Sequence, residues 1–228
     1  MSIDLSWADS AIRQAVQRFW KDRDAKGVRS GGHLKGFDDL IQRALAAGGL
    51  QGVELHKGRT ASVLPGHFRP TKEWDVVATH RGRLIAAVEL KSQVESFGKN
   101  LNNRTEEALG SAVDLGHAVS KADWAGFYKP FVGYIMLLSD DPAVLAVNRL
   151  PKTVEVDGFA VDSVFHGSTY RERYIELCRR MVEAGLYTHA AIITSAPNTA
   201  AYFEPDPRVG VRQFLQSLAA HAVAMRPV

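Results

Sequence analysis

The sequence predicts an α/β fold in which a mixed central β-sheet is flanked by helices. Two short apolar runs, 74–79 and 84–91, are joined tightly at Arg81-Gly82, as in a β-hairpin. Two further runs, FVGYIMLL at 131–138 and HAAIITS at 189–195, are continuously apolar, which is typical of strands buried on both faces. Amphipathic helical patterns surround these runs, so strands and helices are expected to share one core.

Helical periodicity accounts for much of the remaining chain. Asn103 is followed three residues later by Glu106, the spacing of a capping box, which predicts a helix start at this point. Ser168 can cap a later helix, and Gly48-Gly49 is suited to a helix C-terminus. The predicted helices cover about 5–20, 37–45, 104–121, 169–184 and 210–225.

No linker divides the sequence, so residues 1–228 are expected to form a single domain. The helices at about 5–20 and 210–225 are expected to be additions to its core. The segment 52–56 predicts one more short strand. The segment 57–72 contains several Pro and Gly residues and is predicted to be a loop.

Composition excludes several classes of protein. The 228 residues are 46% hydrophobic, enough for a substantial core, and the net charge of +3 is compatible with a nucleic-acid partner. Cys178 is the single cysteine and is expected in the core, so neither a disulfide framework nor a cysteine-based zinc site can form. The start, MSIDLSWADS, does not resemble a signal peptide, and no apolar run approaches the roughly 20 residues of a membrane span. We therefore expect a cytoplasmic protein with no membrane partner.

Charged residues stand at the ends of the predicted hairpin. Asp75 lies near the start of the first run, and Glu89 and Lys91 lie near the end of the second. Side chains alternate between the faces of a strand, so Glu89 and Lys91 share one face while Leu90 points to the opposite face, into the core. Antiparallel pairing brings the start of one strand beside the end of the other, so we expect Asp75 next to Glu89.

This arrangement suits metal-assisted hydrolysis of a phosphodiester. Two carboxylates supply hard oxygen ligands for Mg²⁺ and leave positions for water and phosphate. The ion lowers the pKa of a bound water, and a neighbouring lysine can orient that water and stabilise the developing charge. The spacing alone is common, and its setting in a hairpin before a capped helix is what favours a nuclease. The alternative is a structural hairpin whose charged ends face water.

Longer blocks of sequence carry a resemblance to a known family. LPGHFRPTKEWDVV, LIAAVELKSQV, SFGKNLNNRTEEALGSAVDL, GGHLKGF and, more loosely, STYRERYIELCRRM are similar to the XhoI-type restriction endonucleases of the PD-(D/E)XK nuclease superfamily. These blocks spread the likeness from about residue 31 to about 184. Trp74 stands where the superfamily pattern has its proline.

The resemblance implies a restriction-endonuclease-like core and a bacterial, Mg²⁺-dependent, homodimeric type II enzyme. Such an enzyme cuts both strands of double-stranded DNA at the palindrome CTCGAG, after the first C, and leaves 5′-phosphates on 5′ overhangs. A cognate DNA methyltransferase would belong to the same restriction-modification system. Carried over by position, Asp75 and Glu89 become metal ligands and Lys91 the catalytic lysine.

Other residues are weaker candidates. Asn102, Asn103 and Arg104 could read DNA bases or hold a phosphate at a helix start, although Asn103 could simply cap the helix. Glu107 and Glu54 are candidate additional acids near the metal. Arg69 and Lys72, in RPTK, could grip the DNA backbone, and the alternative is an exposed basic loop. The competing functions are a catalytically silent DNA-binding protein on the same fold and a related nuclease with a longer or different site.

Overall fold

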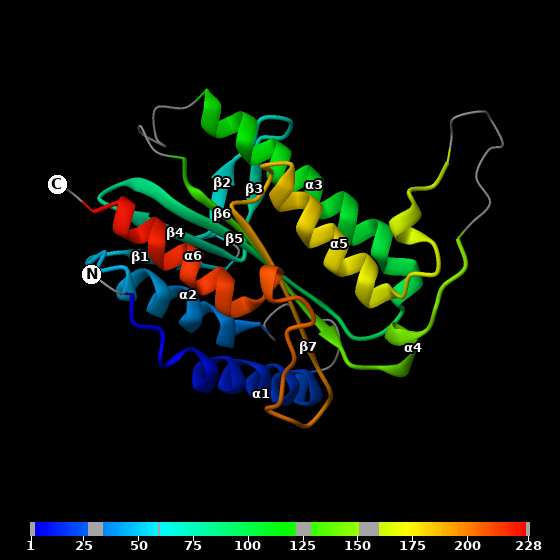
Figure 1. Cartoon of the computed structure of the whole chain (residues 1–228). Helices are drawn as coiled ribbons and strands as arrows, with labels where there is room; N and C mark the ends of the chain where they lie inside the picture. Colours follow the sequence, from blue (N-terminus) through cyan, green and yellow to red (C-terminus); the bar gives the residue numbers. More distant parts are fainter. Residues whose placement is uncertain (1–2, 27–33, 59, 122–128, 151–159, 227–228) are drawn as a thin grey trace.

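The computed structural model describes residues 3–26, 34–58, 60–121, 129–150 and 160–226. Its centre is a five-stranded sheet in the order β1-β4-β5-β6-β7 (Figure 1). The first three of these strands pair antiparallel and the last three pair parallel, so the predicted mixed sheet is confirmed. The strands are β1 (Glu54–Lys57), β4 (Val76–His80), β5 (Arg83–Gln93), β6 (Phe131–Ser139) and β7 (His189–Ser195).

Helices cover both faces of the sheet (Figure 1). One face packs against α1 (Ala8–Lys26), α2 (Lys35–Ala47) and α6 (Val211–Ala224). The opposite face packs against α3 (Phe97–Ser120) and α5 (Tyr170–Glu183), and the short helix α4 (Pro142–Leu145) lies beside α5. This arrangement confirms the predicted α/β class. No helix within the described residues is both long and apolar enough to cross a membrane.

The hairpin between β4 and β5 forms as predicted. Arg81 and Gly82 both adopt positive φ angles, 50° and 74°, as a tight hairpin turn of matching twist requires. The register places Val76 opposite Val88. Leu90 joins the core on the side of α1, α2 and α6, so the flanking residues of β5 project toward α3. The hairpin therefore turns its polar end toward the α3 side of the sheet.

The predicted start of α3 is wrong. The helix begins at Phe97, after Ser96 in the left-handed conformation, and no capping box forms at Asn103. Phe97 is only 6% exposed and packs in the core between the sheet, α3 and α5, with Leu101 against the same core. Burial of these two apolar residues extends the helix by two turns beyond the local capping signal. Asn103 consequently lies inside the helix and not at its N-terminus.

Two smaller predictions are also corrected. The expected loop at 57–72 contains β2 (Val63–Pro65), which pairs antiparallel with β3 (Thr71–Glu73) in a separate two-stranded sheet. The cap of α5 is Thr169, whose hydroxyl forms a capping box with Glu172, and not Ser168. The first three residues of the GGHLKGF block lie outside the described residues.

Candidate active site

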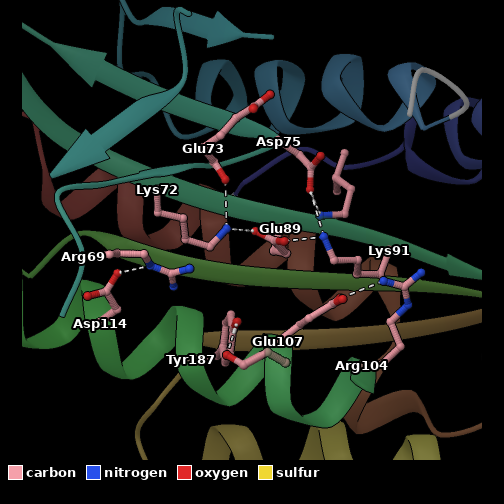
Figure 2. A network of polar contacts seen from close by, with 12 residues as sticks. Arg69, Lys72, Glu73, Asp75, Glu89, Lys91, Arg104, Glu107, Asp114 and Tyr187 are labelled. Carbon is pink, nitrogen blue, oxygen red and sulfur yellow. Dashed lines mark hydrogen bonds and ion pairs between the residues drawn. The ribbon is translucent and has the colours of Figure 1, made fainter. Parts of the chain in front are cut away.

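The hairpin brings Asp75, Glu89 and Lys91 together at one end of the β4–β5 pair (Figure 2). Asp75 directly precedes β4, and its Oδ2 accepts a hydrogen bond from the backbone N–H of Leu90 at 2.7 Å. Lys91 Nζ donates to Glu89 Oε1 and lies 3.9 Å from Asp75 Oδ2. The predicted placement of the three side chains is therefore confirmed, while their catalytic roles stay a prediction.

A second lysine enters the site from the small sheet. Lys72 Nζ donates to Glu89 Oε2 at 2.7 Å and to the carbonyl of Glu73 at 2.9 Å. Its ammonium also lies 4.4 Å from the centre of the Trp74 ring, which is buried. Trp74 thus supports Lys72 through a cation–π contact. Lys72 was expected either to grip the DNA backbone or to lie in an exposed basic loop, and its contact with Glu89 was not predicted.

The pKa values of the two acids, Glu89 and Asp75, are shifted in opposite directions. Burial alone would raise the pKa of Glu89, but Lys91 and Lys72 outweigh burial and hold that pKa below its usual value. Burial raises the pKa of Asp75, and the negative charge of Glu89 raises it further against the smaller opposing effect of Lys91. Two like charges at one edge of the sheet repel each other, and bound cations relieve this repulsion. The pair is therefore an unfavourable arrangement that favours a cation.

The donor set fits a hard divalent cation. No cluster of three or more His, Cys, Asp or Glu side chains suited to a metal occurs in the described part of the chain, so protein ligation would rest on Asp75 and Glu89. Mg²⁺ is commonly held by one or two carboxylates, with water and substrate phosphate completing its octahedron. Binding would require Lys72 or Lys91 to release one Glu89 oxygen, a movement open to long lysine side chains.

An open cavity of about 480 Å³ lies between these acids and α3. Arg69, Lys72, Glu89 and Lys91 line one side. The facing side comes from α3 and includes Arg104, Glu106, Glu107, Gly110 and Ser111. Arg104 and Glu107 form an ion pair at 2.7 Å, so Glu107 lies in the cavity wall but is already paired. The cavity thus places Glu89, which can bind a cation, among basic groups suited to an anion, and Asp75 lies near Glu89 and Lys91 but outside the cavity lining.

The remaining predicted residues lie elsewhere. Asn102 and Asn103 are exposed on α3, and Asn102 lines a different hollow, between α3 and α5. Glu54 pairs with Thr79, whereas Asp75 lies just beyond the opposite end of β4. The structure thus does not bring Glu54 to the two acids. Cys178 is buried, as expected of a core residue.

Comparison with known proteins identifies the class. The type II restriction enzyme BstVI of Geobacillus stearothermophilus is 38% identical over 211 residues, which cover 88% of this chain and 92% of the relative. The type II restriction enzyme XhoI of Xanthomonas vasicola is 33% identical over 244 residues, covering 99% of this chain and 89% of the relative. AbrI of Azospirillum brasilense, also a type II restriction enzyme, is 39% identical over 158 residues, or 62% of this chain and 71% of the relative. Proteins of this class are site-specific nucleases.

The family model described as "Restriction endonuclease XhoI" matches residues 17–204. The chain therefore belongs to the XhoI family of type II restriction endonucleases, and the expected family is confirmed. No solved structure shows a significant match to the chain.

Proposed function

We propose that the protein is an Mg²⁺-dependent type II restriction endonuclease that cleaves both strands of duplex DNA at CTCGAG. Cleavage after the first C leaves 5′-phosphates on 5′ overhangs. The observation that carries this proposal is the arrangement of Asp75, Glu89 and Lys91 at one end of a hairpin, beside a cavity lined by both basic and acidic side chains, in a chain of this family. The expected site follows from the family likeness.

The side chains divide the chemistry among them. Asp75 and Glu89 would hold the cation, which when bound polarises the phosphate and lowers the pKa of a coordinated water. Lys91 can orient the attacking water and stabilise charge on the phosphoryl oxygens. Arg69 and Lys72 lie on the same cavity wall, where they can bind the DNA backbone. Arg104 faces them from α3 and can reach the same strand.

A palindromic site implies a two-fold enzyme. We infer that two copies of the chain assemble on the duplex and that each cuts one strand, because isologous dimers match the symmetry of a palindrome. The enzyme would act in the bacterial cytoplasm beside a cognate DNA methyltransferase, which protects host sites. Size-exclusion chromatography with light scattering, with and without a duplex that carries CTCGAG, tests the dimer directly.

Digestion of plasmid DNA with and without Mg²⁺, followed by sequencing of the fragment ends, tests the function. Uniform 5′ overhangs at CTCGAG that require Mg²⁺ are expected. Uniform ends at another sequence would retain the chemistry and replace the proposed site. Activity that persists in EDTA would remove the metal from the mechanism.

The Lys91→Ala variant separates a nuclease from a silent DNA-binding protein. A nuclease should lose at least about a hundredfold in cleavage rate, because an electrostatic contact to the transition state is removed. Its binding to duplex DNA should remain within a few-fold of the parent. If neither the parent nor the variant cuts while both bind DNA, the silent binder is the better description.

A further inference from the structure

A buried carboxylate on α3 holds the loop that enters β3. Asp114 is 2% exposed, and its Oδ1 accepts hydrogen bonds from the backbone N–H groups of His67 and Phe68, at 2.7 and 2.8 Å. Its Oδ2 accepts from Arg69 Nε at 2.7 Å. One side chain thus fixes three consecutive residues that lie 45 to 47 positions earlier in the sequence.

The loop has no alternative path over this carboxylate. A Cβ atom at Gly66 would lie 2.5 Å from the carbonyl oxygen of Arg69 and 2.8 Å from Asp114 Oδ2, so a larger residue does not fit. The backbone N–H of Gly66 also donates to the carbonyl of Pro70 at 3.3 Å. The loop is therefore closed on itself and anchored to α3, and its side chains are held in set positions.

The anchored loop presents aromatic rings to solvent. Phe68 is 68% exposed, although its backbone is fixed, and His67 and His117 are exposed beside it. The ring centres of His67 and His117 lie 5.2 Å apart in a stacked arrangement, and the Phe68 ring lies 5.5 Å from His117. We call these three residues the ring cluster. What sets Phe68 apart from other exposed apolar residues is that its backbone is anchored and that it lies among two further rings.

The ring cluster is continuous with the candidate active site. Arg69, next to Phe68, lines the cavity that holds Glu89 and Lys91. On α3, Gly110 lines the same cavity, and His117 follows seven residues later, two turns on along the same face of the helix. Seven helical residues span about 10 Å, a length equal to about three base-pair steps of a duplex strand. A strand that runs along α3 from a phosphate in the cavity would therefore pass the ring cluster within a few base pairs.

We propose that the ring cluster is a contact surface for the DNA duplex, held in position by Asp114 and packed against a deoxyribose or a base edge near the cleaved phosphate. This proposal rests on the proposed function, since it requires DNA in the cavity. Phe makes apolar contacts with base edges such as the thymine methyl in a duplex groove, and the neighbouring Arg69 can bind a phosphate. Asp114 is a positioning residue here, because it acts through the loop and contacts no DNA itself.

Substitution of Phe68 tests the contact. Phe68→Ala should weaken binding of a CTCGAG duplex about tenfold, and Phe68→Trp should retain most of the affinity, because a larger ring preserves the contact. Phe203→Ala is the matched control, since Phe203 is 57% exposed but lies beside β7, against Thr194. Fluorescence anisotropy of labelled duplex in EDTA measures affinity without cleavage. Equal affinities for the parent and Phe68→Ala would overturn the proposal.

A double-mutant cycle tests the role of Asp114. Asp114→Asn should also weaken DNA binding several-fold in the parent, and this effect should shrink when Phe68 is already Ala. Full additivity of the two substitutions would refute positioning through the ring cluster. A cleavage assay of the parent distinguishes failure of the proposed nuclease function from failure of the proposed DNA contact. If the parent cuts DNA and Phe68→Ala binds DNA as tightly as the parent, only the contact by the ring cluster is rejected. A parent that neither binds nor cuts DNA rejects both.

Discussion

Two acidic regions lie near the α3 side of the sheet, the buried Asp114 on α3 and the Asp75–Glu89 pair on the hairpin, and their electrostatic surroundings differ. Asp114 is surrounded by donors: two backbone N–H groups and Arg69 lower its pKa below the usual value, against the effect of burial. Glu89 has two lysine partners, but Asp75 lies beside it, and burial together with the charge of Glu89 raises the pKa of Asp75. The first region favours the ionised form of its carboxylate, and the second disfavours the ionised form of Asp75, through burial first and then through the charge of Glu89.

The direction of the pKa shift, lowered for Asp114 and raised for Asp75, distinguishes a structural carboxylate from a functional one. A carboxylate whose lone pairs all face donors stabilises the fold and gains nothing from a metal ion. A buried carboxylate whose pKa is raised by burial and by a neighbouring carboxylate, as that of Asp75 is, reduces stability in the absence of a cation, and such perturbed acids are typical of catalytic sites. The contrast gives opposite expectations for the same substitution, Asp to Asn, at Asp75 and at Asp114.

The largest expected effect is that of Asp75→Asn on catalysis. Loss of one of two metal carboxylates should reduce Mg²⁺-dependent cleavage at least about a thousandfold, measured as single-turnover rates on a plasmid substrate. Asn can still accept the hydrogen bond from the Leu90 N–H, so the hairpin should remain. Asp39→Asn, at an exposed position on α2, is the control and should keep full activity. Cleavage by Asp75→Asn within tenfold of the parent would contradict the assignment of this acid.

The same variant should be more stable than the parent when no metal is present. The raised pKa of Asp75 in the folded protein means that the ionised form is disfavoured by folding. The free-energy cost of keeping Asp75 ionised in the folded protein is therefore present at neutral pH. This cost disappears at low pH, where Asp75 is protonated in both the folded and the unfolded protein. Thermal unfolding in EDTA should show a higher Tm for Asp75→Asn at pH 7 and equal values at low pH. A lower Tm at pH 7 would show that Asp75 is structural.

Lys72→Met should have an intermediate effect. Lys72 is one of two cations that hold the pKa of Glu89 low, and it lines the cavity where the phosphate would bind. Its loss should lower the cleavage rate about ten- to a hundredfold while Lys91 keeps the centre assembled. Lys21→Met, at an exposed position on α1, is the matched control. A loss as large as that of Lys91→Ala would instead make Lys72 the principal catalytic lysine.

Asp114→Asn should act mainly on stability, and in the opposite direction to Asp75→Asn. The substitution replaces a charged acceptor of three hydrogen bonds by a neutral amide, which should reduce the free energy of unfolding by about 1.5 to 3 kcal/mol at pH 7. The lowered pKa of Asp114 means that this stabilisation is present above the unfolded-state pKa and is lost as the pH falls. Urea unfolding at several pH values should show a difference from the parent that shrinks in acid. Stability equal to the parent at pH 7 would remove Asp114 as an anchor.

The same contrast explains what the sequence could predict. Asp75, Glu89 and Lys91 lie within one hairpin, so strand alternation and antiparallel register suffice to bring them together. The contact between Asp114 and His67 joins residues 47 positions apart, and no local pattern indicates it. Lys72 enters the site only because β2 and β3 form a small sheet in a segment that reads as a loop.

The error at α3 has a related cause. The capping spacing at Asn103 and Glu106 is a real local signal, but burial of Phe97 outweighs it. Burying a large apolar side chain contributes more than one cap, roughly 1.5 to 3 kcal/mol against about 1 kcal/mol. Which of the two prevails depends on whether the sheet offers a place for Phe97, and the sequence does not encode that contact locally.

The smallest expected effect separates the two candidate additional acids. Glu107 lines the cavity but is paired with Arg104 at 2.7 Å, whereas Glu54 lies at the far end of β1 and is exposed. Glu107→Gln should change cleavage only a few-fold, because exposed ion pairs contribute little, and Glu54→Gln should leave it unchanged. Cleavage by Glu107→Gln measured over a range of Mg²⁺ concentrations shows whether Glu107 only pairs with Arg104 or also binds the metal. A large increase in the Mg²⁺ concentration needed for half-maximal cleavage would make Glu107 a third ligand, and the catalytic acids would then extend from the hairpin onto α3.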